Sequence, residues 1–225
     1  MKYGFFVTGT DTGVGKTLVS AALVYRLAQA GFKAAGMKPV AAGCVMQGGQ
    51  LVSDDVEQLR AAGNVELALA VINPYAFAPP LAPHIAARQA GVAIELAMVK
   101  EAFLAASQAV DALVVEGVGG FRVPLNDSED TADMAALLGL PLVLVVGMRL
   151  GCLSHALLTA EVIASRGLVL AGWVANRVDP AMDAFEDNLA ALEQRLSAPC
   201  LGVVPYMGQV DFRAVAEYLD IGPLL

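Results

Sequence analysis

The sequence predicts an α/β fold, a doubly wound and mostly parallel sheet with helices on both faces. Short apolar runs alternate along the chain with segments of helical periodicity, and this alternation is typical of parallel strands joined by helical crossovers. The apolar runs are rich in Val and Leu and contain few polar residues, as expected of strands that are buried on both faces. Glycines stand where two of the predicted helices should end, at Gly31 and Gly167.

The apolar runs predict strands at residues 3–8, 34–38, 112–116, 142–146, 169–175 and 201–204. The periodic segments predict helices at residues 16–30, 54–62, 94–109, 130–138, 154–166, 182–196 and 211–219. No linker, repeat or low-complexity tract interrupts this order, so residues 1–225 are expected to form a single domain. We interpret Pro79, Pro80 and Pro83 as a rigid loop.

The residues between the first strand and the first helix form a phosphate-binding loop, Gly9-Thr-Asp-Thr-Gly-Val-Gly-Lys-Thr17. Backbone N–H groups and a helix N-terminus would face the anion, Lys16 would supply a cation, and the Thr17 hydroxyl would reach magnesium. The common pattern has glycine at position 10, where this chain has Thr10, with Gly9 one place earlier. The loop is therefore a variant P-loop, and the fold is expected to be of the P-loop NTPase type.

Composition excludes several classes of protein. The chain is 57% hydrophobic with a mean hydropathy of +0.62, but its most apolar run, residues 137–148, is broken by Gly139 and Pro141 and is too short to span a membrane. A net charge of -8 argues against nucleic-acid binding. The three cysteines lie far apart, so neither a disulfide framework nor a metal site is expected. With the nucleotide motif so near Met1, we expect no secretion signal and a cytoplasmic protein.

Several charged residues stand where predicted strands end, close to the expected phosphate site. Lys38 ends the second strand, and a cation at the carboxyl end of a parallel strand points toward such a site. Glu116 closes the third strand before the glycine-rich segment Gly117-Val-Gly-Gly120, in the position of a Walker-B acid that holds magnesium. Asp54 and Asp55 begin a helix, where acids are also common for reasons of capping alone, so at most one of them need be a ligand.

Three further segments are consistent with a binding site, although each has a plain structural explanation. The stiff, partly aromatic stretch 73–84 is a candidate substrate wall or simply packing under a loop. The segment 150–155 precedes a helix whose N–H groups could receive a carboxylate, or it is an ordinary helix start. Asn176 follows a strand and is a candidate for reading the edge of a base, on weak evidence.

Taken in order, these motifs resemble the dethiobiotin synthetase family over nearly the whole chain. The matching segments are Thr8-Gly-Thr-Asp-Thr12, Met37-Lys-Pro-Val40, Asn73-Pro-Tyr75, Pro83-His84, Glu116-Gly-Val-Gly-Gly120, Leu150-Gly-Cys152, Gly172-Trp-Val-Ala-Asn176 and Val204-Pro205. The variant P-loop is the most specific of them. By this resemblance, the enzyme carboxylates 7,8-diaminononanoate with CO2 and closes a ureido ring, using ATP with Mg2+ and giving dethiobiotin, ADP and phosphate.

The resemblance also implies residue roles. Lys38, Lys16 and Thr12 would act in catalysis, with Lys38 contacting both a substrate carbamate and the γ-phosphate, and Thr17, Asp55 and Glu116 would hold the metal. ATP would be bound by Gly13, Val14, Gly15, Lys16, Thr17, Leu18, Asp55, Glu116, Gly117, Val118, Gly119, Asn176, Arg177, Pro205, Tyr206 and Met207. The other substrate would contact Lys38, Ala42, Gly151, Cys152 and Ser154. Since segment 150–155 would serve the other subunit, a homodimer with active sites at its interface is expected.

Two positions depart from the family pattern. Ala42 stands where some relatives carry a hydroxyl group that contacts the carbamate, and Ser154 stands where relatives carry Asn. The first change leaves one hydrogen bond to the substrate either missing or supplied by the backbone, and the second shortens the reach to its carboxylate. Neither change affects the residues that handle phosphate.

Two other functions fit the P-loop. The first is an ATP-dependent amidoligase of the cobyrinic acid amide synthase type, but such enzymes usually carry a glutaminase domain, for which 225 residues leave no room. The second is a nucleotide-switched ATPase without an enzymatic product, like the partition and septum-site ATPases. These carry a signature lysine five residues before the loop lysine, where this chain has Asp11.

Overall fold

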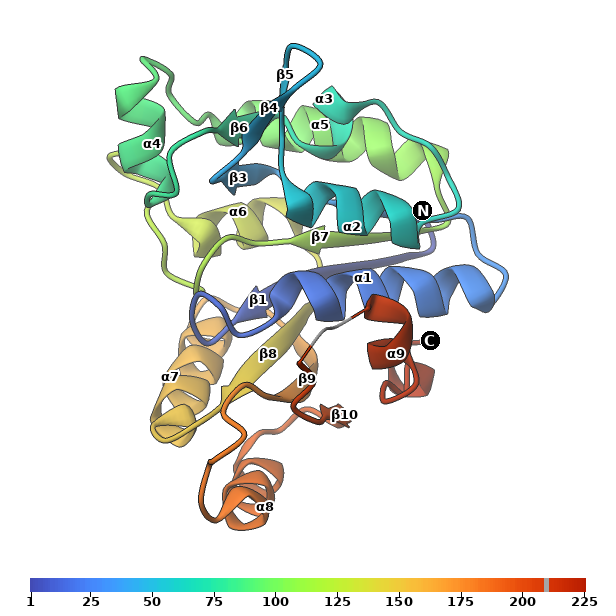
Figure 1. Cartoon of the computed structure of the whole chain (residues 1–225), viewed down its shortest axis with the longest axis vertical. Helices are drawn as coiled ribbons and strands as arrows, with labels where there is room; N and C mark the ends of the chain where they lie inside the picture. Colours follow the sequence, from blue (N-terminus) through green and yellow to red (C-terminus); the bar gives the residue numbers. More distant parts are fainter. Residues whose placement is uncertain (209–210) are drawn as a thin grey trace.

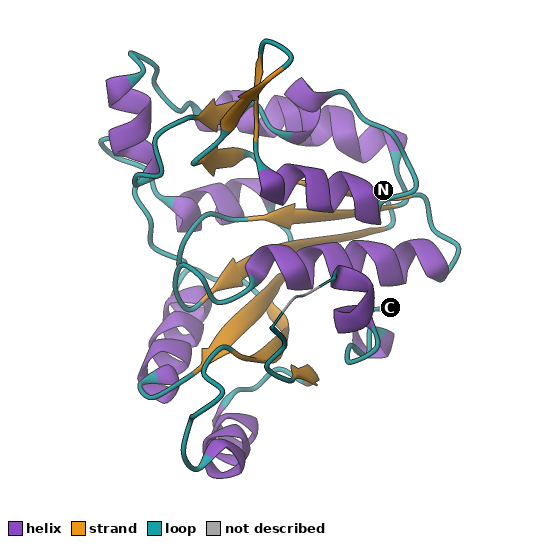
Figure 2. Cartoon of the chain, in the orientation of Figure 1, coloured by secondary structure: helices purple, strands orange, loops and turns teal. Residues whose placement is uncertain are grey.

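A parallel sheet forms the centre of the molecule. The computed structural model describes residues 1–208 and 211–225, and in this part of the chain six parallel strands pair in the order β10-β9-β8-β1-β7-β2 (Figures 1 and 2). They are β1 (Tyr3–Gly9), β2 (Ala34–Met37), β7 (Ala112–Glu116), β8 (Leu142–Met148), β9 (Leu170–Arg177) and β10 (Cys200–Val204). Each lies within a few residues of a predicted apolar run, and the predicted fold class is confirmed.

The central strands are buried on both faces because successive side chains enter different hydrophobic clusters. In β1, Phe5 and Val7 contribute to one cluster, whereas Phe6 between them contributes to another. Neighbouring β7 repeats the pattern, with Val114 on the side of Phe5 and Val115 on the side of Phe6. A strand with two buried faces needs apolar residues at every position, so the sequence shows unbroken apolar runs.

Helices cover both faces of the sheet. The face of Phe5 is covered by α1 (Lys16–Gln29), α2 (Asp54–Ala62) and α9 (Phe212–Ala216). The face of Phe6 is covered by α5 (Leu96–Ala109) and α6 (Thr131–Leu138) and, over β8 and β9, by α7 (Cys152–Ser165) and α8 (Phe185–Arg195). Figure 1 shows α1 lying along the strands with its N-terminus at the end of β1.

The order of the strands explains where a ligand site can form. From β1 the chain passes through α1 to β2 on one side of β1, and from β7 it passes through α6 to β8 on the other side. In open sheets of this kind, ligands bind at the carboxyl ends of the strands where the direction of winding reverses. The loops after β1, β2 and β7 meet at this edge, and they carry the P-loop, Lys38 and Glu116.

The segment between β2 and α5 contains elements that the sequence did not predict. Strands β3 (Val40–Ala42) and β6 (Tyr75–Phe77) form a parallel pair, β4 (Val45–Gln47) and β5 (Gln50–Val52) form an antiparallel hairpin, and α3 (Leu69–Ile72) precedes β6. The interpretation of Pro83 as part of a rigid loop was wrong, because Pro83 begins helix α4 (Pro83–Gln89). Proline suits the first position of a helix, where the missing N–H would have no helical partner.

Several helix boundaries differ from the predictions. Helix α7 begins at Cys152, two residues before the predicted start, because Gly151 adopts a left-handed conformation (φ 94°) at its N-cap. Helices α8 and α9 are shorter than predicted, and Gly222–Leu224 forms a short 3₁₀ helix. Among the described residues, no helix is both long and apolar enough to cross a membrane.

Candidate active site

A cavity of about 900 Å³ opens at the carboxyl edge of the sheet, between the P-loop and the ends of β2 and β7. Most of the residues predicted to handle phosphate, metal and carbamate line it. These residues are Thr12, Gly13, Gly15, Lys16, Thr17, Leu18, Lys38, Ala42, Asp55, Glu116, Val118 and Gly119. The structure therefore brings together residues that lie as far apart in the sequence as the P-loop and the loop after β7.

The P-loop has the backbone geometry of a phosphate cradle. Gly13 and Gly15 adopt positive φ angles of 74° and 87°, a region that favours glycine, and Gly15 is the N-cap of α1. The N-terminal N–H groups of α1 therefore point toward the cavity side of the loop, where an anion is favoured. Gly9 is needed for a different reason, since a Cβ there would lie 2.7 Å from Val14 Cγ2.

Thr10 has a structural role that explains the departure from the common P-loop pattern. Its hydroxyl oxygen accepts a hydrogen bond from the Gly147 N–H at 3.2 Å, and its own N–H donates to the Val145 carbonyl at 3.0 Å. Both partners belong to β8. A glycine at position 10 would lack the first bond, so the threonine fastens the start of the loop to the neighbouring strand.

Asp11 fastens the next turn of the loop. Its Oδ2 accepts from Arg149 Nη2 at 2.5 Å and its Oδ1 accepts from the Thr12 N–H at 2.7 Å. The Asp11 carbonyl in turn accepts from Lys16 Nζ at 2.9 Å. The position of the signature lysine thus holds an acid whose partner, Arg149, comes from the same chain.

Lys16 is a buried cation whose pKa is lowered. Burial and the nearby positive charge of Lys38 together lower its pKa to about 8, although Glu116 acts in the opposite direction. A neutral backbone carbonyl is its hydrogen-bond partner. An anion in the cavity would stabilise the charged form, so the site favours the binding of a group such as phosphate.

Lys38 and two carboxylates form a charge cluster at the centre of the cavity. Lys38 Nζ lies 2.8 Å from Asp55 Oδ2 and 2.5 Å from Glu116 Oε1, and the same Glu116 oxygen accepts from the Thr17 hydroxyl at 2.8 Å. The side chains of Lys38 and Glu116 are 5% and 0% exposed. The other oxygen of Glu116, Oε2, is buried and has no hydrogen-bond partner among the described residues.

The pKa shifts in the cluster follow from burial and from mutual attraction. Burial opposes the charged form of Lys38, but Glu116 and Asp55 outweigh it and raise the pKa of the ammonium above its usual value. Burial likewise raises the pKa of Glu116, and Lys38 only partly offsets that effect. For Asp55, burial is outweighed by Lys38 and the pKa is lowered. The ammonium is thus the group that stabilises the negative charges.

The backbone of Lys38 is held firmly. Its N–H donates to the Ile72 carbonyl at 2.9 Å, and its carbonyl accepts from Asn73 Nδ2 at 2.6 Å. The Asn73 amide also donates to the Tyr75 carbonyl at 3.0 Å. The stretch 73–84 was a candidate substrate wall. Its first residue, Asn73, instead holds the backbone of Lys38. Within this stretch, only Pro80, Leu81, Ala82 and Pro83 line the cavity.

The donor set fits magnesium bound together with a nucleotide. Thr17, Asp55 and Glu116 offer oxygen donors, and the unpaired Glu116 Oε2 is a buried acceptor of the kind that a cation satisfies. Among the described residues, no three His, Cys, Asp or Glu side chains converge into a metal site of their own. Magnesium usually takes only one or two carboxylates and completes its shell with phosphate oxygens and water. Of the two candidate aspartates, Asp55 is the one at the cluster, whereas Asp54 is exposed.

The residues predicted near the adenine do not line the cavity. Asn176 Nδ2 donates to the Val14 carbonyl at 2.8 Å, and a Cβ at Gly15 would collide with this amide, so Asn176 packs against the P-loop. Arg177 donates to the Pro180 carbonyl and lies 4.9 Å from the centre of the Phe185 ring. Pro205, Tyr206 and Met207 follow β10, where Tyr206 is half exposed and Met207 packs partly against the core.

The predicted carboxylate-binding segment also lies outside the cavity of its own chain. Gly151 is the N-cap of α7, and Cys152 and Ser154 lie in the first turn. Cys152 is buried, Ser154 is exposed, and the adjacent Leu150 is 95% exposed. Arg149, which directly precedes the segment, forms an ion pair with Asp11 of the P-loop.

Two cavity residues were missed by the sequence analysis. Gln58 lies on α2 one turn after Asp55, so helical spacing alone would have placed both side chains on one face. Val123 follows the glycines after β7, and Gly119 brings it close, since a Cβ at Gly119 would lie 2.9 Å from Val123 Cγ2 and 3.4 Å from Thr12 Oγ1. No sequence signal marks Val123. Gly117 meets Phe6 instead of the cavity, because a Cβ there would lie 3.2 Å from its ring.

The fold resembles that of several solved structures. The chain matches the MinD cell division protein of Aquifex aeolicus with a TM-score of 0.55 and 17% identity, over 95% of this chain and 86% of that one. It matches a ParA family ATPase from Chlorobium tepidum with a TM-score of 0.54 and 16% identity, over 92% of this chain and 86% of that one. At such low identity these likenesses concern the fold alone.

The sequence comparisons are more specific. A family model described as an AAA domain (AAA_26) matches residues 3–214. An ATP-dependent dethiobiotin synthetase BioD of Ralstonia nicotianae is 53% identical over 225 residues, covering 100% of this chain and 98% of the relative. One of Aromatoleum aromaticum is 54% identical over 217 residues, covering 96% of each. With this identity over its whole length, and with the P-loop and charge cluster in place, the chain belongs to the ATP-dependent dethiobiotin synthetase family.

Proposed function

We propose that the protein joins CO2 to 7,8-diaminononanoate at the expense of ATP, closes the ureido ring and releases dethiobiotin, ADP and phosphate. The observation that carries the proposal is the cluster of Lys38, Asp55 and Glu116 beside the P-loop. A buried ammonium would then lie next to the γ-phosphate of ATP bound at the P-loop, where a second anion must come within bonding distance. The names of the relatives, which state ATP dependence and dethiobiotin synthesis, support the same reaction.

The reaction proceeds in three steps. An amine of the substrate attacks CO2, forms an N–C bond and loses a proton, which gives a carbamate. A carbamate oxygen then attacks the γ-phosphorus, and the bond to ADP breaks, which gives a carbamic–phosphoric anhydride. The second amine attacks the carbamate carbon and loses a proton, phosphate leaves with the bonding electrons, and the five-membered ring closes. The second step brings two anions together, so positioning and positive charge dominate its catalysis.

The residues of the cavity have distinct tasks in this scheme. The backbone N–H groups of residues 13–18 and the Lys16 ammonium hold the phosphates. Thr17, Asp55 and Glu116 would hold magnesium, which when bound neutralises charge on the β- and γ-phosphates. Lys38 stabilises the negative charge that builds up between carbamate and γ-phosphate, and Thr12, at the mouth of the same cavity, contacts the substrate's anionic group.

The cavity wall suits the hydrocarbon chain of the diamine. Pro80, Leu81, Ala82 and Pro83 line it opposite the polar groups, and Ala42 adds a methyl group where some relatives have a hydroxyl. An apolar wall with few polar groups is the usual composition of a small-molecule site. Carbamate binding in this protein would therefore depend on Lys38 and the backbone more than in relatives with a hydroxyl.

The proposal includes a homodimer that works in the cytoplasm. Gly151, Cys152 and Ser154 do not line the cavity of their own chain, and the exposed Leu150 beside them is available for contact with a second subunit. The N-terminus of α7 would then receive the carboxylate of the diamine that is bound in the partner's cavity. The adenine would extend from the P-loop past Asn176 toward the segment 205–207.

Product analysis tests the proposed reaction. The purified protein is incubated with the diamine, ATP, Mg2+ and carbon-13 bicarbonate, and each component is omitted in turn. We expect dethiobiotin carrying one labelled carbon only in the complete mixture, with one ADP released for each product molecule. Release of ADP at the same rate without the diamine would contradict the proposal and favour a nucleotide-switched ATPase.

A further inference from the structure

The Lys38 ammonium contacts the same two carboxylate groups that the proposed magnesium ion would use. Lys38 Nζ contacts Asp55 Oδ2 at 2.8 Å and Glu116 Oε1 at 2.5 Å. The second of these oxygens also accepts from the Thr17 hydroxyl. Of the three residues that would hold the metal, Asp55 and Glu116 contact the Lys38 ammonium directly, and Thr17 is hydrogen-bonded to Glu116.

Two cations cannot occupy this position together. Magnesium binds oxygen at about 2.0–2.1 Å in a near-octahedral shell. An ion on Asp55 Oδ2 or Glu116 Oε1 would need lone pairs that the ammonium now uses, and an ion on the unpaired Glu116 Oε2 would still share that carboxylate with the ammonium. The repulsion between a divalent ion and an ammonium on the same carboxylates is strong where water is excluded, and both Lys38 and Glu116 are buried. Metal binding therefore requires that Lys38 leaves at least one of the two carboxylates.

The charge of the cavity decides when this exchange is favourable. Asp55 and Glu116 face two buried ammonium groups, Lys38 and Lys16, and only Lys38 contacts the carboxylates. A divalent ion arriving alone would leave the cavity with a net positive charge. An ion arriving with a triphosphate brings enough negative charge to attract the displaced ammonium as well.

The local structure allows the side chain of Lys38 to move while its backbone stays. The Lys38 N–H and carbonyl are fixed by Ile72 and Asn73, and Pro39 follows directly. The side chain lines a cavity of about 900 Å³, so a change of rotamer can carry the ammonium from the carboxylates toward the phosphate side. No rearrangement of β2 is needed.

We propose that Lys38 holds the cation position between Asp55 and Glu116 until a metal–nucleotide complex displaces it, so that the protein binds the metal with the nucleotide and not ahead of it. The displaced ammonium is then free to face the reacting anions. Binding of the metal–nucleotide complex and movement of the Lys38 ammonium toward these anions therefore occur together. This inference rests on the magnesium site of the proposed function. It adds that Lys38 competes with the metal, in addition to its proposed contact with the substrate.

Manganese titration followed by electron paramagnetic resonance tests the competition, with Mn2+ alone as the probe and then Mn2+ with ADP. The wild-type protein should bind Mn2+ weakly alone and much more tightly with ADP. Lys38→Met removes the ammonium but keeps most of the stem, and it should raise the affinity for Mn2+ alone by about tenfold or more, because the carboxylates lose their competing cation. Lys16→Met is the matched control, since it removes a buried ammonium of the same cavity that touches neither carboxylate; it should raise that affinity less than about threefold.

The outcomes separate this inference from the proposed function. Equal gains for Lys38→Met and Lys16→Met, or no gain for Lys38→Met, would overturn the competition. Tight binding of Mn2+ to the wild-type protein without ADP would do the same. Failure of Mn2+ to bind even with ADP would instead remove the magnesium site from the proposed function, whatever the role of Lys38.

A crystal structure of the wild-type protein with Mg2+ and ADP gives a second test that does not depend on the stability of a variant. We expect the metal on Asp55 or Glu116, with Lys38 Nζ withdrawn from the oxygen that the metal occupies. A structure in which the metal binds and Lys38 keeps both of its present contacts would contradict the proposal.

Discussion

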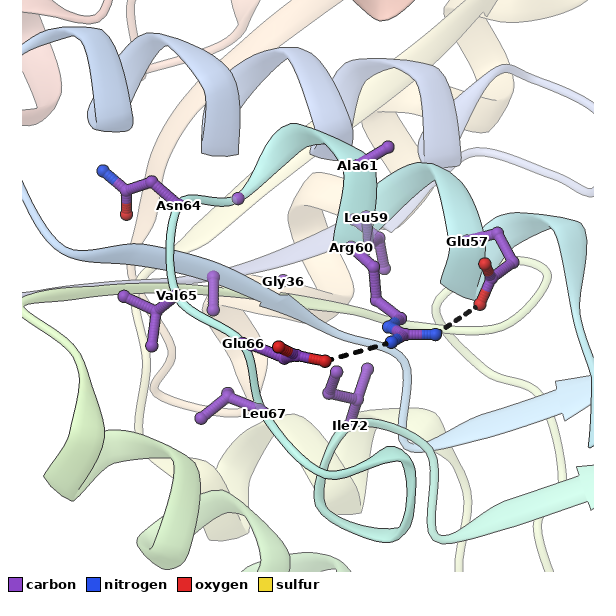
Figure 3. Close-up of a pocket in the computed structure, with 12 residues that line it drawn as sticks. Gly36, Glu57, Leu59, Arg60, Ala61, Asn64, Val65, Glu66, Leu67 and Ile72 are labelled. Atoms are coloured by element: carbon purple, nitrogen blue, oxygen red, sulfur yellow. Dashed lines mark hydrogen bonds and ion pairs between the residues drawn. The ribbon is translucent and has the colours of Figure 1, made fainter.

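Helix α2 and strand β2 separate two hollows of very different character. One is the cavity at the P-loop, and the other, of about 540 Å³, lies at the edge of the sheet between α2, β2 and the segment 63–67 (Figure 3). Helix α2 serves both, because Asp55 and Gln58 face the first whereas Glu57 and Arg60 face the second. The two differ in how their polar groups are satisfied.

In the edge hollow the charged and amide side chains are paired within the chain. Figure 3 shows Arg60 between Glu57, at 2.9 Å, and Glu66, at 3.9 Å. Asn64 accepts from the Ala34 N–H and donates to the Phe32 carbonyl, which closes part of the open edge of β2. Groups that are satisfied in this way have no need of a ligand, and we interpret the edge hollow as a structural feature.

In the P-loop cavity some polar groups have no partner and others repel each other. Glu116 Oε2 is buried without a partner, two buried ammonium groups repel each other, and the pKa of Lys16 is lowered. Such an arrangement costs stability and persists where a ligand relieves it. The comparison teaches that unsatisfied chemistry, and not the mere presence of a hollow, identifies the functional site of this fold.

The largest difference between the two hollows is expected in enzyme activity, when Lys38 of the P-loop cavity or Arg60 of the edge hollow is replaced by Met. Lys38→Met should lower kcat/KM for dethiobiotin formation by about 100- to 1,000-fold, because it removes the positive charge between the two reacting anions. Arg60→Met is the matched control in the edge hollow and should leave the rate unchanged. Steady-state assay of the labelled product measures both, and equal losses in the two variants would erase the distinction.

The second prediction concerns the pH dependence of nucleotide binding. The pKa of Lys16 is about 8, and a bound phosphate would raise it, so binding above that pH takes up a proton. The dissociation constant for ADP should therefore increase as the pH rises through about 8, by up to about tenfold per pH unit, and should be insensitive to this group below it.

Isothermal titration at several pH values measures the effect. The Lys16→Met protein is the control, because it should bind ADP more weakly at every pH without this dependence. A wild-type affinity that stays constant from about pH 7.5 to 9.5 would mean that Lys16 keeps its proton throughout that range.

The third prediction concerns the wall that both hollows share. A Cβ at Gly36 of β2 would lie 2.8 Å from Leu59 Cβ on α2, so Gly36→Ala should push the helix off the strand. Overpacking of this kind costs about 1–3 kcal/mol of unfolding free energy. Gly208→Ala is the control, since a Cβ there meets no atom of the described residues within 4 Å, and urea denaturation compares the two. A Gly36→Ala protein as stable as the control would show that α2 can shift freely.

The smallest effect is expected for the stability of the Arg60→Met protein. The ion pairs of Arg60 are partly exposed, and such pairs contribute about 0–1 kcal/mol. Thermal unfolding of this variant should therefore stay close to that of the wild-type protein. A large loss of thermal stability would contradict this prediction and would mean that the ion pairs of Arg60 contribute substantially to the folded state.

Much of this molecule was predictable from local sequence. Helix α2 was predicted at its observed bounds, β7 likewise, and the P-loop was found between β1 and α1. The reason is physical, since glycines with positive φ, helix periodicity and doubly buried strands each leave a local pattern. The short strands β3 to β6 left none, because three-residue strands carry too few side chains to establish a period.

The candidate site was predictable in part. Lys38 and Glu116 were found from their positions at strand ends, and a buried parallel sheet brings such ends to one edge. The choice of Asp55 over Asp54 was open on local grounds, since both residues begin the same helix. The direction of a side chain at a helix start depends on how the helix packs, and the packing of Leu59 against Gly36 turns Asp55 toward Lys38.

The sequence by itself determined the fold class, the phosphate loop and the identity of the charged residues, because each depends on the chemistry of a few consecutive residues. Only the tertiary structure decided that Lys38 and Glu116, 78 positions apart, share a hydrogen bond, and that Asn176 packs on the P-loop. It also decided that one hollow beside α2 is satisfied and the other is not. These facts depend on distances between remote segments, and such distances follow from the order and packing of strands and helices, which no local pattern records.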